Sequence, residues 1–321
     1  MNNLITVCIP TCNRPDLLKE AVQSCCEQTY RPLEILVGDD SEDDRAASAL
    51  SSIKSDADFT FAYHKNESRL GQAANVNSLF TRAQGDRVVL LHDDDLLTSQ
   101  AVDILAECWS AYPTLTAVFG KQYIISVSGE IDQQETDNVN QLYGRTKERA
   151  GLQRSSLESA LMQQFPNDGF MIHADVARRI RLRGRDEVGN ASDFDFGIRV
   201  AQEGASFYFV NEFTCKYRHT PGSISTSSWG GFEYMFPIVE NLRVPPEVEA
   251  ARELALKRMV PVYVKYLGFQ RKRVRALRTL FGPYGDSRML LSMKGWILLG
   301  QILAPGIDPA LQKIRKALSQ R

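Results

Sequence analysis

The chain has 321 residues, of which 43% are hydrophobic and 24% are charged, and its formal net charge is −1. These values are ordinary for a soluble globular protein, and no stretch approaches the roughly 18 apolar residues that a membrane span needs. The six cysteines form no C-x-x-C pair, and the first residues lack the basic and apolar regions of a signal peptide. We therefore expect a reduced protein that stays in the cytoplasm.

Strand and helix patterns alternate in the first part of the chain. Buried-strand patterns cover residues 4–10, 33–41 and 87–91, and apolar residues at helical spacing cover 15–29 and 71–84. Such alternation predicts an α/β domain with a mostly parallel sheet that is flanked by helices.

The patterns after residue 98 are less regular. Residues 120–150 are polar and irregular, with a hairpin expected near SVSGE (126–130). Helices are expected at 157–165 and 192–204, a strand region follows at 205–220, and from about 246 the chain is strongly helical.

Polar clusters follow three of the predicted strands: TCNR (11–14), DDSEDD (39–44) and HDDD (92–95). All three fall on one edge if the sheet is parallel, and ligands of such sheets bind outside the carboxyl ends of the strands. The alternative is three solvated loops. Acids at two strand ends and Asn-Arg at the third favour a ligand-binding site.

The HDDD cluster places three acids directly after an apolar strand, where they repel one another and lose hydration. A divalent cation removes that repulsion, and oxygen ligands suit Mg²⁺ or Mn²⁺. Because Mg²⁺ usually completes its shell with substrate phosphates, a phosphate-bearing ligand is expected. No G-x-G-x-x-G motif and no Walker lysine are present, which argues against dinucleotide and P-loop binding.

Two stretches resemble the inverting GT-A glycosyltransferases of family 2: ITVCIPTCNRPDLLKEAVQSCCEQTYRPLEILVGDDS and GQAANVNSLFTRAQGDRVVLLHDDDLLT. The resemblance covers roughly residues 4–225. It implies a GT-A fold, in which a mostly parallel nucleotide-binding sheet is flanked by helices and a helical extension follows at the C-terminus. The implied catalytic domain spans 1–235, with nucleotide-sugar binding in 1–98 and the acceptor side in 99–235, and the basic helical region spans 236–321.

The activity implied by the resemblance is metal-dependent, inverting transfer of a hexosyl or N-acetylhexosaminyl group. The donor would be a nucleoside-diphosphate sugar, a UDP-sugar by preference, and the cofactor Mn²⁺ or Mg²⁺. The acceptor would be a lipid-linked glycan of a bacterial surface polysaccharide such as O-antigen or capsule. Two alternatives stay open: a nucleotidyltransferase, and a non-catalytic protein that binds nucleotide-sugars or serves as a scaffold.

The resemblance also implies roles for individual residues on the donor side. The residues that would contact the nucleotide-sugar are Pro10, Thr11, Asn13, Arg14, Asp39, Asn77, Asp93 and Arg218. Asp94 is the implied metal ligand, and His219 in YRHTPGSIS is a second candidate. Asp95 is a candidate supporting residue. His92 stands where many relatives carry another acid, so either Asp95 or a water would supply an additional metal contact. The glycine- and serine-rich stretch 222–231 is expected to form a mobile flap over the donor.

Inversion requires a carboxylate that takes the proton of the acceptor hydroxyl. GNASDFDFGIRVAQEG resembles the helix that carries this base in the family and places Asp193 there, with Ser192 in place of the usual Glu. Asp195 is the rival, but a two-residue step points elsewhere around a helix. The other interpretation is that both acids merely favour the helix start. Asp168 is a candidate contact for an acceptor hydroxyl, or part of a plain turn.

The C-terminal region is strongly basic. Residues 251–321 contain 15 Lys and Arg against three acids, whereas residues 1–250 contain 23 against 36. Basic amphipathic helices with Trp296 suggest attachment to an anionic membrane surface, at the inner face of the plasma membrane. The alternatives are a helical subdomain on the catalytic core and a homodimer. No nucleic-acid-binding motif accompanies the charge.

Overall fold

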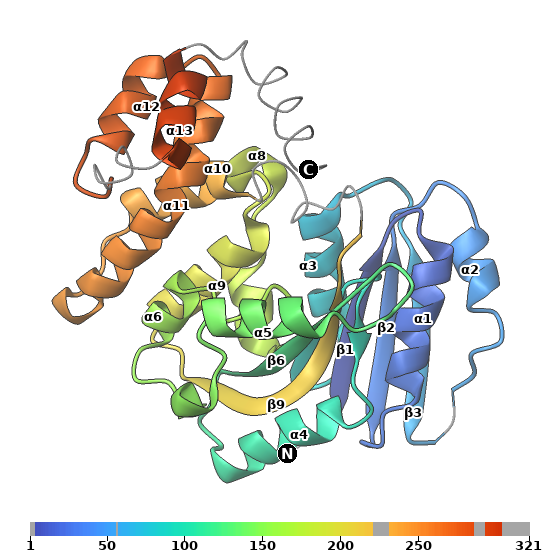
Figure 1. Cartoon of the computed structure of the whole chain (residues 1–321). Coiled ribbons are helices and arrows are strands. Elements are labelled where there is room, and N and C mark those ends of the chain that lie inside the picture. Colours follow the sequence, from blue (N-terminus) through green and yellow to red (C-terminus); the bar gives the residue numbers. More distant parts are fainter. Residues whose placement is uncertain (1–3, 56, 221–230, 286–292, 304–321) are drawn as a thin grey trace. The chain divides into compact units, whose positions relative to one another are not determined.

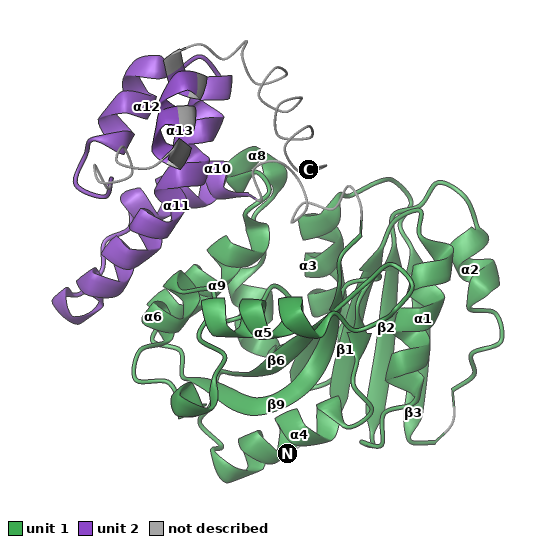
Figure 2. Ribbon diagram, viewed as in Figure 1, with its two compact units in different colours: residues 1–226 green, residues 227–321 purple. Residues whose placement is uncertain are grey.

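The computed structural model describes residues 4–55, 57–220, 231–285 and 293–303. The chain forms two compact units, residues 1–226 and residues 227–321 (Figure 2). The sequence places the division after residue 235, a little later in the chain. Each unit has its own packing and is described separately.

A nine-stranded mixed sheet forms the centre of the first unit (Figure 1). Four neighbouring parallel strands begin the sheet, in the order β3 (Phe59–Lys65), β2 (Leu33–Asp39), β1 (Ile5–Thr11) and β4 (Arg87–Leu90). The sheet continues with β8 (Met171–His173), β6 (Ala117–Ile125), β9 (Phe207–Arg218) and β5 (Leu96–Leu97), and β7 (Gly151–Leu152) pairs with β9. The predicted α/β class with a mostly parallel nucleotide-side sheet is confirmed.

Helices connect the strands of this unit. They are α1 (Pro15–Cys26), α2 (Arg45–Ala49), α3 (Gln72–Arg82), α4 (Ala101–Ala111), α5 (Gln133–Leu142), α6 (Ser156–Leu161), α7 (Ala174–Ile180), α8 (Arg185–Val188) and α9 (Ser192–Gln202), with a short 3₁₀ turn at Lys147–Arg149. The hairpin expected near 126–130 is present, since Ser126 N–H donates to Glu130 O at 2.8 Å. The expectation that 120–150 is irregular was wrong for α5, whose polar sequence begins at a capping Asp132 that accepts from Glu135 N–H.

Strands β1 and β2 are buried along their whole length, as expected for central parallel strands covered on both faces. Their register pairs Thr11 with Asp39, so both strands end at the same level. Beyond the end of β4, Leu91 N–H still donates to Cys8 O at 3.0 Å, and residues 92–95 leave the sheet at this edge. The expectation that the three polar clusters share one edge is confirmed.

Gly169 holds the chain close to this edge from the other side. Its φ is +70°, and a Cβ there would lie 2.7 Å from Cys215 Cβ, so only glycine fits. Its N–H donates to Leu90 O at 2.8 Å. This tight approach places Asp168 beside the 92–95 turn.

The second unit is helical, with α10 (Phe232–Glu240), a 3₁₀ turn at Pro246–Val248, α11 (Glu249–Phe269), α12 (Arg273–Leu280) and α13 (Met293–Leu303). Apolar residues of α11 recur at helical spacing and are buried, and the rings of Phe236 and Tyr263 stack with centroids 4.3 Å apart. Among the described residues, no helix is both long and apolar enough to cross a membrane.

Candidate functional site

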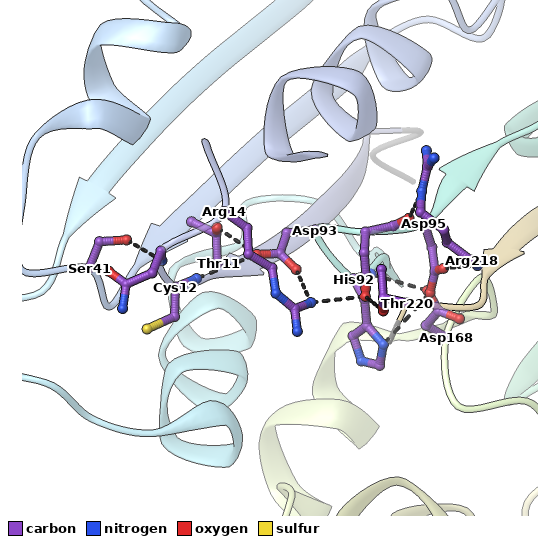
Figure 3. Close-up of polar contacts among 12 residues, drawn as sticks. Thr11, Cys12, Arg14, Ser41, His92, Asp93, Asp95, Asp168, Arg218 and Thr220 are labelled. Atoms are coloured by element: carbon purple, nitrogen blue, oxygen red, sulfur yellow. Dashed lines mark hydrogen bonds and ion pairs between the residues drawn. The ribbon is translucent and has the colours of Figure 1, made fainter. Parts of the chain in front are cut away.

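The end of β1 and the 92–95 turn are joined by a compact set of hydrogen bonds and ion pairs (Figure 3). Thr11 Oγ1 donates to Asp93 Oδ2 at 2.7 Å, and Arg14 Nη1 lies 3.2 Å from Asp93 Oδ1. The same nitrogen lies 2.9 Å from Asp94 Oδ2, which also accepts from Thr220 Oγ1 at 3.0 Å. Three residues predicted to contact the nucleotide-sugar and the predicted metal ligand therefore meet at one point.

Asp93 is buried within this set, and burial raises the pKa of its carboxyl. The hydrogen bond from Thr11 and the positive charge of Arg14 act in the opposite direction. Arg14 is different, because 42% of its side chain is exposed and its guanidinium sits at the surface of the site. An anionic ligand that arrives here would meet Arg14 first.

At the end of β2, both acids already have partners. Asp39 accepts from Tyr63 Oη at 2.5 Å and from Ser41 N–H at 2.8 Å. Asp40 accepts from Asn66 Nδ2 at 2.7 Å and from Gly71 N–H at 2.7 Å. Asp40 thereby ties the loop before α3 to the sheet, and Asp39 lies fully buried at the strand end beside Thr11.

Three other residues predicted to contact the nucleotide differ in their exposure and in their hydrogen-bond partners. Pro10 is buried at the end of β1, whereas Asn13 is exposed, has a φ of 59°, and donates its N–H to Ser41 Oγ at 2.7 Å. Asn77 is not joined to this set. Its amide exchanges two hydrogen bonds of 2.8 Å with the backbone of Leu182, which fastens α3 to the loop after α7.

A group able to hold a metal ion lies in the 92–95 turn. Each of the residues His92, Asp94 and Asp95 offers one ligand atom, and these three atoms lie within 4.8 Å of one another. His92 Nε2 and Asp95 Oδ2 are buried and make no hydrogen bond within the described part of the chain. One imidazole and two carboxylates, two of which have a buried polar atom that lacks a partner among the described residues, fit a divalent cation.

The charges around this group explain its pKa shifts. Burial, followed by the nearby charge of Asp168, raises the pKa of Asp95 well above its ordinary value. Burial alone would lower the pKa of His92, but the nearby carboxylates, of which Asp168 and Asp193 act most strongly, together raise that pKa. His92, the residue that departs from the family pattern, thus lies in the negative field of the surrounding acids.

Asp168 supports the turn from inside the fold. It accepts from His92 N–H at 3.1 Å and from Gln122 Nε2 at 3.2 Å. Gln122 in turn accepts from Arg145 Nη1 at 2.6 Å, and burial lowers the pKa of Arg145 to about 10. Asp168 is fully buried in this network.

The two acids at the start of α9 have different surroundings. Asp195 is buried and paired with Arg199 at 2.7 Å, and Arg183 lies 3.5 Å from its other oxygen. Asp193 is half-buried, and its Oδ1 is enclosed without a hydrogen-bond partner among the described residues. Burial raises the pKa of Asp193, the charge of His92 opposes the rise, and the charge of Asp168 adds to it.

The end of β9 supplies the last two predicted residues. Arg218 is fully buried, and its guanidinium donates to Asp94 O, Val127 O and Glu20 Oε2 at 2.6–2.8 Å, while its N–H donates to Asp95 Oδ1. Arg218 therefore braces the turn. His219 donates its N–H to Ile125 O and packs its ring on Tyr217, outside the group of ligand atoms.

Sequence reasoning missed Gln122, Arg145 and Thr220. Gln122 and Arg145 lie in the stretch that was expected to be irregular, where no motif marks them. Thr220 directly follows Arg218 and His219, so its position next to a recognised segment was the only available signal. Residues 221–230, which contain most of the expected flap, lie outside the described residues.

Comparisons with known proteins agree on one family. A family model described as Glycosyl transferase family 2 matches residues 6–170. A GalNAc(5)-diNAcBac-PP-undecaprenol beta-1,3-glucosyltransferase of Campylobacter jejuni is 33% identical over 98% of this chain and 98% of its own. The glycosyltransferase GlyG of Streptococcus pneumoniae is 22% identical over 70% of this chain and 73% of its own.

Solved structures resemble this one in fold. S. aureus TarS 1–349 in complex with UDP-GlcNAc has a TM-score of 0.60 at 14% identity, over 92% of this chain and 86% of that one. The mannosyltransferase PcManGT from Pyrobaculum calidifontis, in complex with GDP-Man and Mn²⁺, has a TM-score of 0.58 at 19% identity, over 95% and 87%.

Proposed function

Because this chain belongs to glycosyl transferase family 2 and has the GT-A fold, we propose that it transfers a sugar from a UDP-sugar to a hydroxyl of a lipid-linked glycan, with inversion. The lipid-linked acceptor is supported by the Campylobacter relative, whose name specifies a PP-undecaprenol glycan and a beta linkage. A beta linkage is what inversion produces from an alpha-linked donor. We place the reaction in the assembly of a bacterial surface polysaccharide such as O-antigen or capsule.

The observation that carries the mechanism is the unpartnered, enclosed Oδ1 of Asp193 beside the charged 92–95 turn. A carboxylate whose pKa is raised accepts a proton more readily than an ordinary aspartate. In the proposed step, Asp193 takes the proton of the acceptor hydroxyl as its oxygen attacks the anomeric carbon. The bond from that carbon to the diphosphate breaks, and the nucleoside diphosphate leaves.

Donor binding is assigned to the edge formed by β1, β2 and the 92–95 turn. Arg14 is the exposed cation that would meet the diphosphate, while Thr11 and Asp93 fix the end of β1 beneath it. Asp39 is proposed to lie beneath the base and to hold the end of β2 there, because both of its oxygens accept hydrogen bonds, from Tyr63 and Ser41. Asn77 and Arg218 are proposed to act by holding the fold, because their polar groups are engaged elsewhere.

We propose that Asp94, His92 and Asp95 hold the cation, with His92 taking the place assigned to His219 from the sequence. Bound there, a divalent cation would supply positive charge to the departing diphosphate. An imidazole ligand suits transition metals better than Mg²⁺, so Mn²⁺ is the proposed cofactor. Asp168 would hold the turn through His92 N–H, rather than contact the acceptor.

The test is an assay with UDP-glucose, UDP-N-acetylglucosamine or UDP-N-acetylgalactosamine, each with Mn²⁺, and an undecaprenyl-diphosphate glycan. UDP release that depends on acceptor, together with a product heavier by one sugar and beta-linked by NMR, is the expected result. Pyrophosphate release would instead identify a nucleotidyltransferase. Nucleotide-sugar binding without release of either product would identify a non-catalytic binder.

A further inference from the structure

The turn between α11 and α12 is an exposed surface that combines basic and apolar side chains. We call residues 269–275 the basic turn, and every residue in it is exposed. Phe269 and Val274 have exposed fractions of 64% and 65%, and Phe281 at the end of α12 is 55% exposed. Single exposed apolar residues are common, but three around one basic segment form a candidate binding surface.

The basic turn has a defined backbone. Arg271 N–H donates to Gly268 O at 2.9 Å, and Lys272 N–H donates to Leu267 O at 2.8 Å. Arg271 has a φ of 57°, the left-handed conformation that commonly ends a helix. Because these bonds close α11 and lead directly into α12, the side chains of the turn are presented on a fixed support.

Helix α12 has one face for packing and another for solvent. Ala276 and Leu280 are buried. Val274 precedes Ala276 by two residues and therefore points to the opposite side of the helix, while Phe281 lies two turns after Val274 and returns to that side. The exposed apolar residues of α12 thus share a face that the described residues of this unit do not pack against.

One positive charge of the turn takes part in the packing of this unit, since the Arg275 guanidinium lies 5.7 Å from the centroid of the Tyr263 ring. Among the residues that the structure describes, Arg271, Lys272 and Arg273 have no ion pair with an acid, and Arg275 alone lies 3.6 Å from Glu240. Arg273 and Arg275 occupy the first turn of α12, which has no acid and where the helix dipole disfavours positive charge. An anionic partner would offset this cost.

We propose that the basic turn and Phe281 dock on the surface of an anionic lipid bilayer. Phe269, Val274 and Phe281 insert at the level of the headgroups, and Arg271, Lys272 and Arg273 bind lipid phosphates. A symmetric dimer through this patch would place like charges against each other. A nucleic acid would use the charges and leave the valine and phenylalanines without a role. The proposal is independent of the proposed sugar transfer.

Sedimentation with vesicles tests the proposal without donor or acceptor. The full chain should bind vesicles of equal parts phosphatidylcholine and phosphatidylglycerol, and binding to pure phosphatidylcholine should be at least about tenfold weaker. Lys272→Gln/Arg273→Gln should reduce binding to the anionic vesicles about tenfold or more. Arg243→Gln/Lys257→Gln removes the same two positive charges from exposed positions elsewhere in this unit, and should reduce it less than threefold, roughly.

A second pair of variants tests insertion of the apolar side chains. Val274→Ser/Phe281→Ser should weaken vesicle binding about tenfold, whereas Leu152→Ser/Leu254→Ser, which removes side chains of similar exposure, should leave it within about twofold. Equal losses in patch and control variants would overturn the proposal. Equal binding to neutral and anionic vesicles would also overturn it. So would a wild-type chain that binds no vesicles and forms a dimer, if that dimer dissociates in Val274→Ser/Phe281→Ser.

Discussion

Two groups of buried acids lie at the same edge of the sheet, and they differ in how their oxygens are satisfied. Asp39 and Asp40 at the end of β2 and Asp93 after β4 form the first group, and both oxygens of each accept hydrogen bonds or ion pairs. In the second group, Asp95 Oδ2, Asp193 Oδ1 and His92 Nε2 are buried and have no hydrogen-bond partner in the part of the chain that the structure describes. Satisfied polar groups fix a structure, while buried unsatisfied ones need a ligand or a proton. The comparison separates a scaffold from a reactive region.

Asp193→Asn is expected to have the largest effect. If Asp193 is the general base, the amide should lower kcat about a hundred- to ten-thousandfold, because it cannot take the acceptor proton. Binding of UDP-sugar and Mn²⁺, measured by calorimetry, should be unchanged. The matched control is Ser192→Ala, which removes only the hydrogen bond from its hydroxyl to Arg183 O. A wild-type rate in Asp193→Asn would mean that another group acts as the general base.

Asp195 resembles the scaffold group, because each of its oxygens is paired with an arginine, and Asp195→Asn tests that side of the comparison. Removing the charge leaves the largely buried Arg199 without its counterion, which should lower the free energy of unfolding by about 3 kcal/mol. Urea unfolding measures this loss, and activity per folded molecule should stay within about twofold of wild type. A large loss of kcat in a variant that remains folded would show that Asp195, and not its neighbour two residues earlier, does the chemistry.

The candidate site was predictable where its residues follow strands, and not where they meet across the fold. Thr11, Asp39 and Asp94 follow parallel strands, so the sequence order alone brings them to one edge. Gln122 reaches Asp168 from 46 residues away, and no local pattern encodes such a contact. The roles of Asp193 and Asp195 are also set by distant partners, since Arg183 and His92 come from other segments.

His92→Ala and His219→Ala test which histidine belongs to the metal group. Loss of a ligand should weaken Mn²⁺ binding at least about tenfold in His92→Ala, while His219→Ala should bind Mn²⁺ nearly as wild type because its ring packs on Tyr217 instead. Calorimetric titration with Mn²⁺ alone measures both affinities and needs no turnover. The opposite ranking would restore the assignment made from the sequence.

The smallest expected effect concerns the pH dependence of stability. Burial raises the folded-state pKa of Asp193 above the ordinary value of 3.8, so the folded chain binds more protons than the unfolded chain between those two pKa values. The contribution of Asp193 to stability is therefore lost as the pH rises through this window, by about 1.4 kcal/mol for each unit of elevation. Asp193→Asn lacks this loss. The unfolding free energy of the variant minus that of wild type, measured in urea with EDTA, should therefore increase from about pH 4 upward. A difference that stays constant with pH would mean that the Asp193 carboxylate is well solvated or hydrogen-bonded in the folded chain. Asp193 would then not differ from the scaffold group, and the contrast between the two groups would fail.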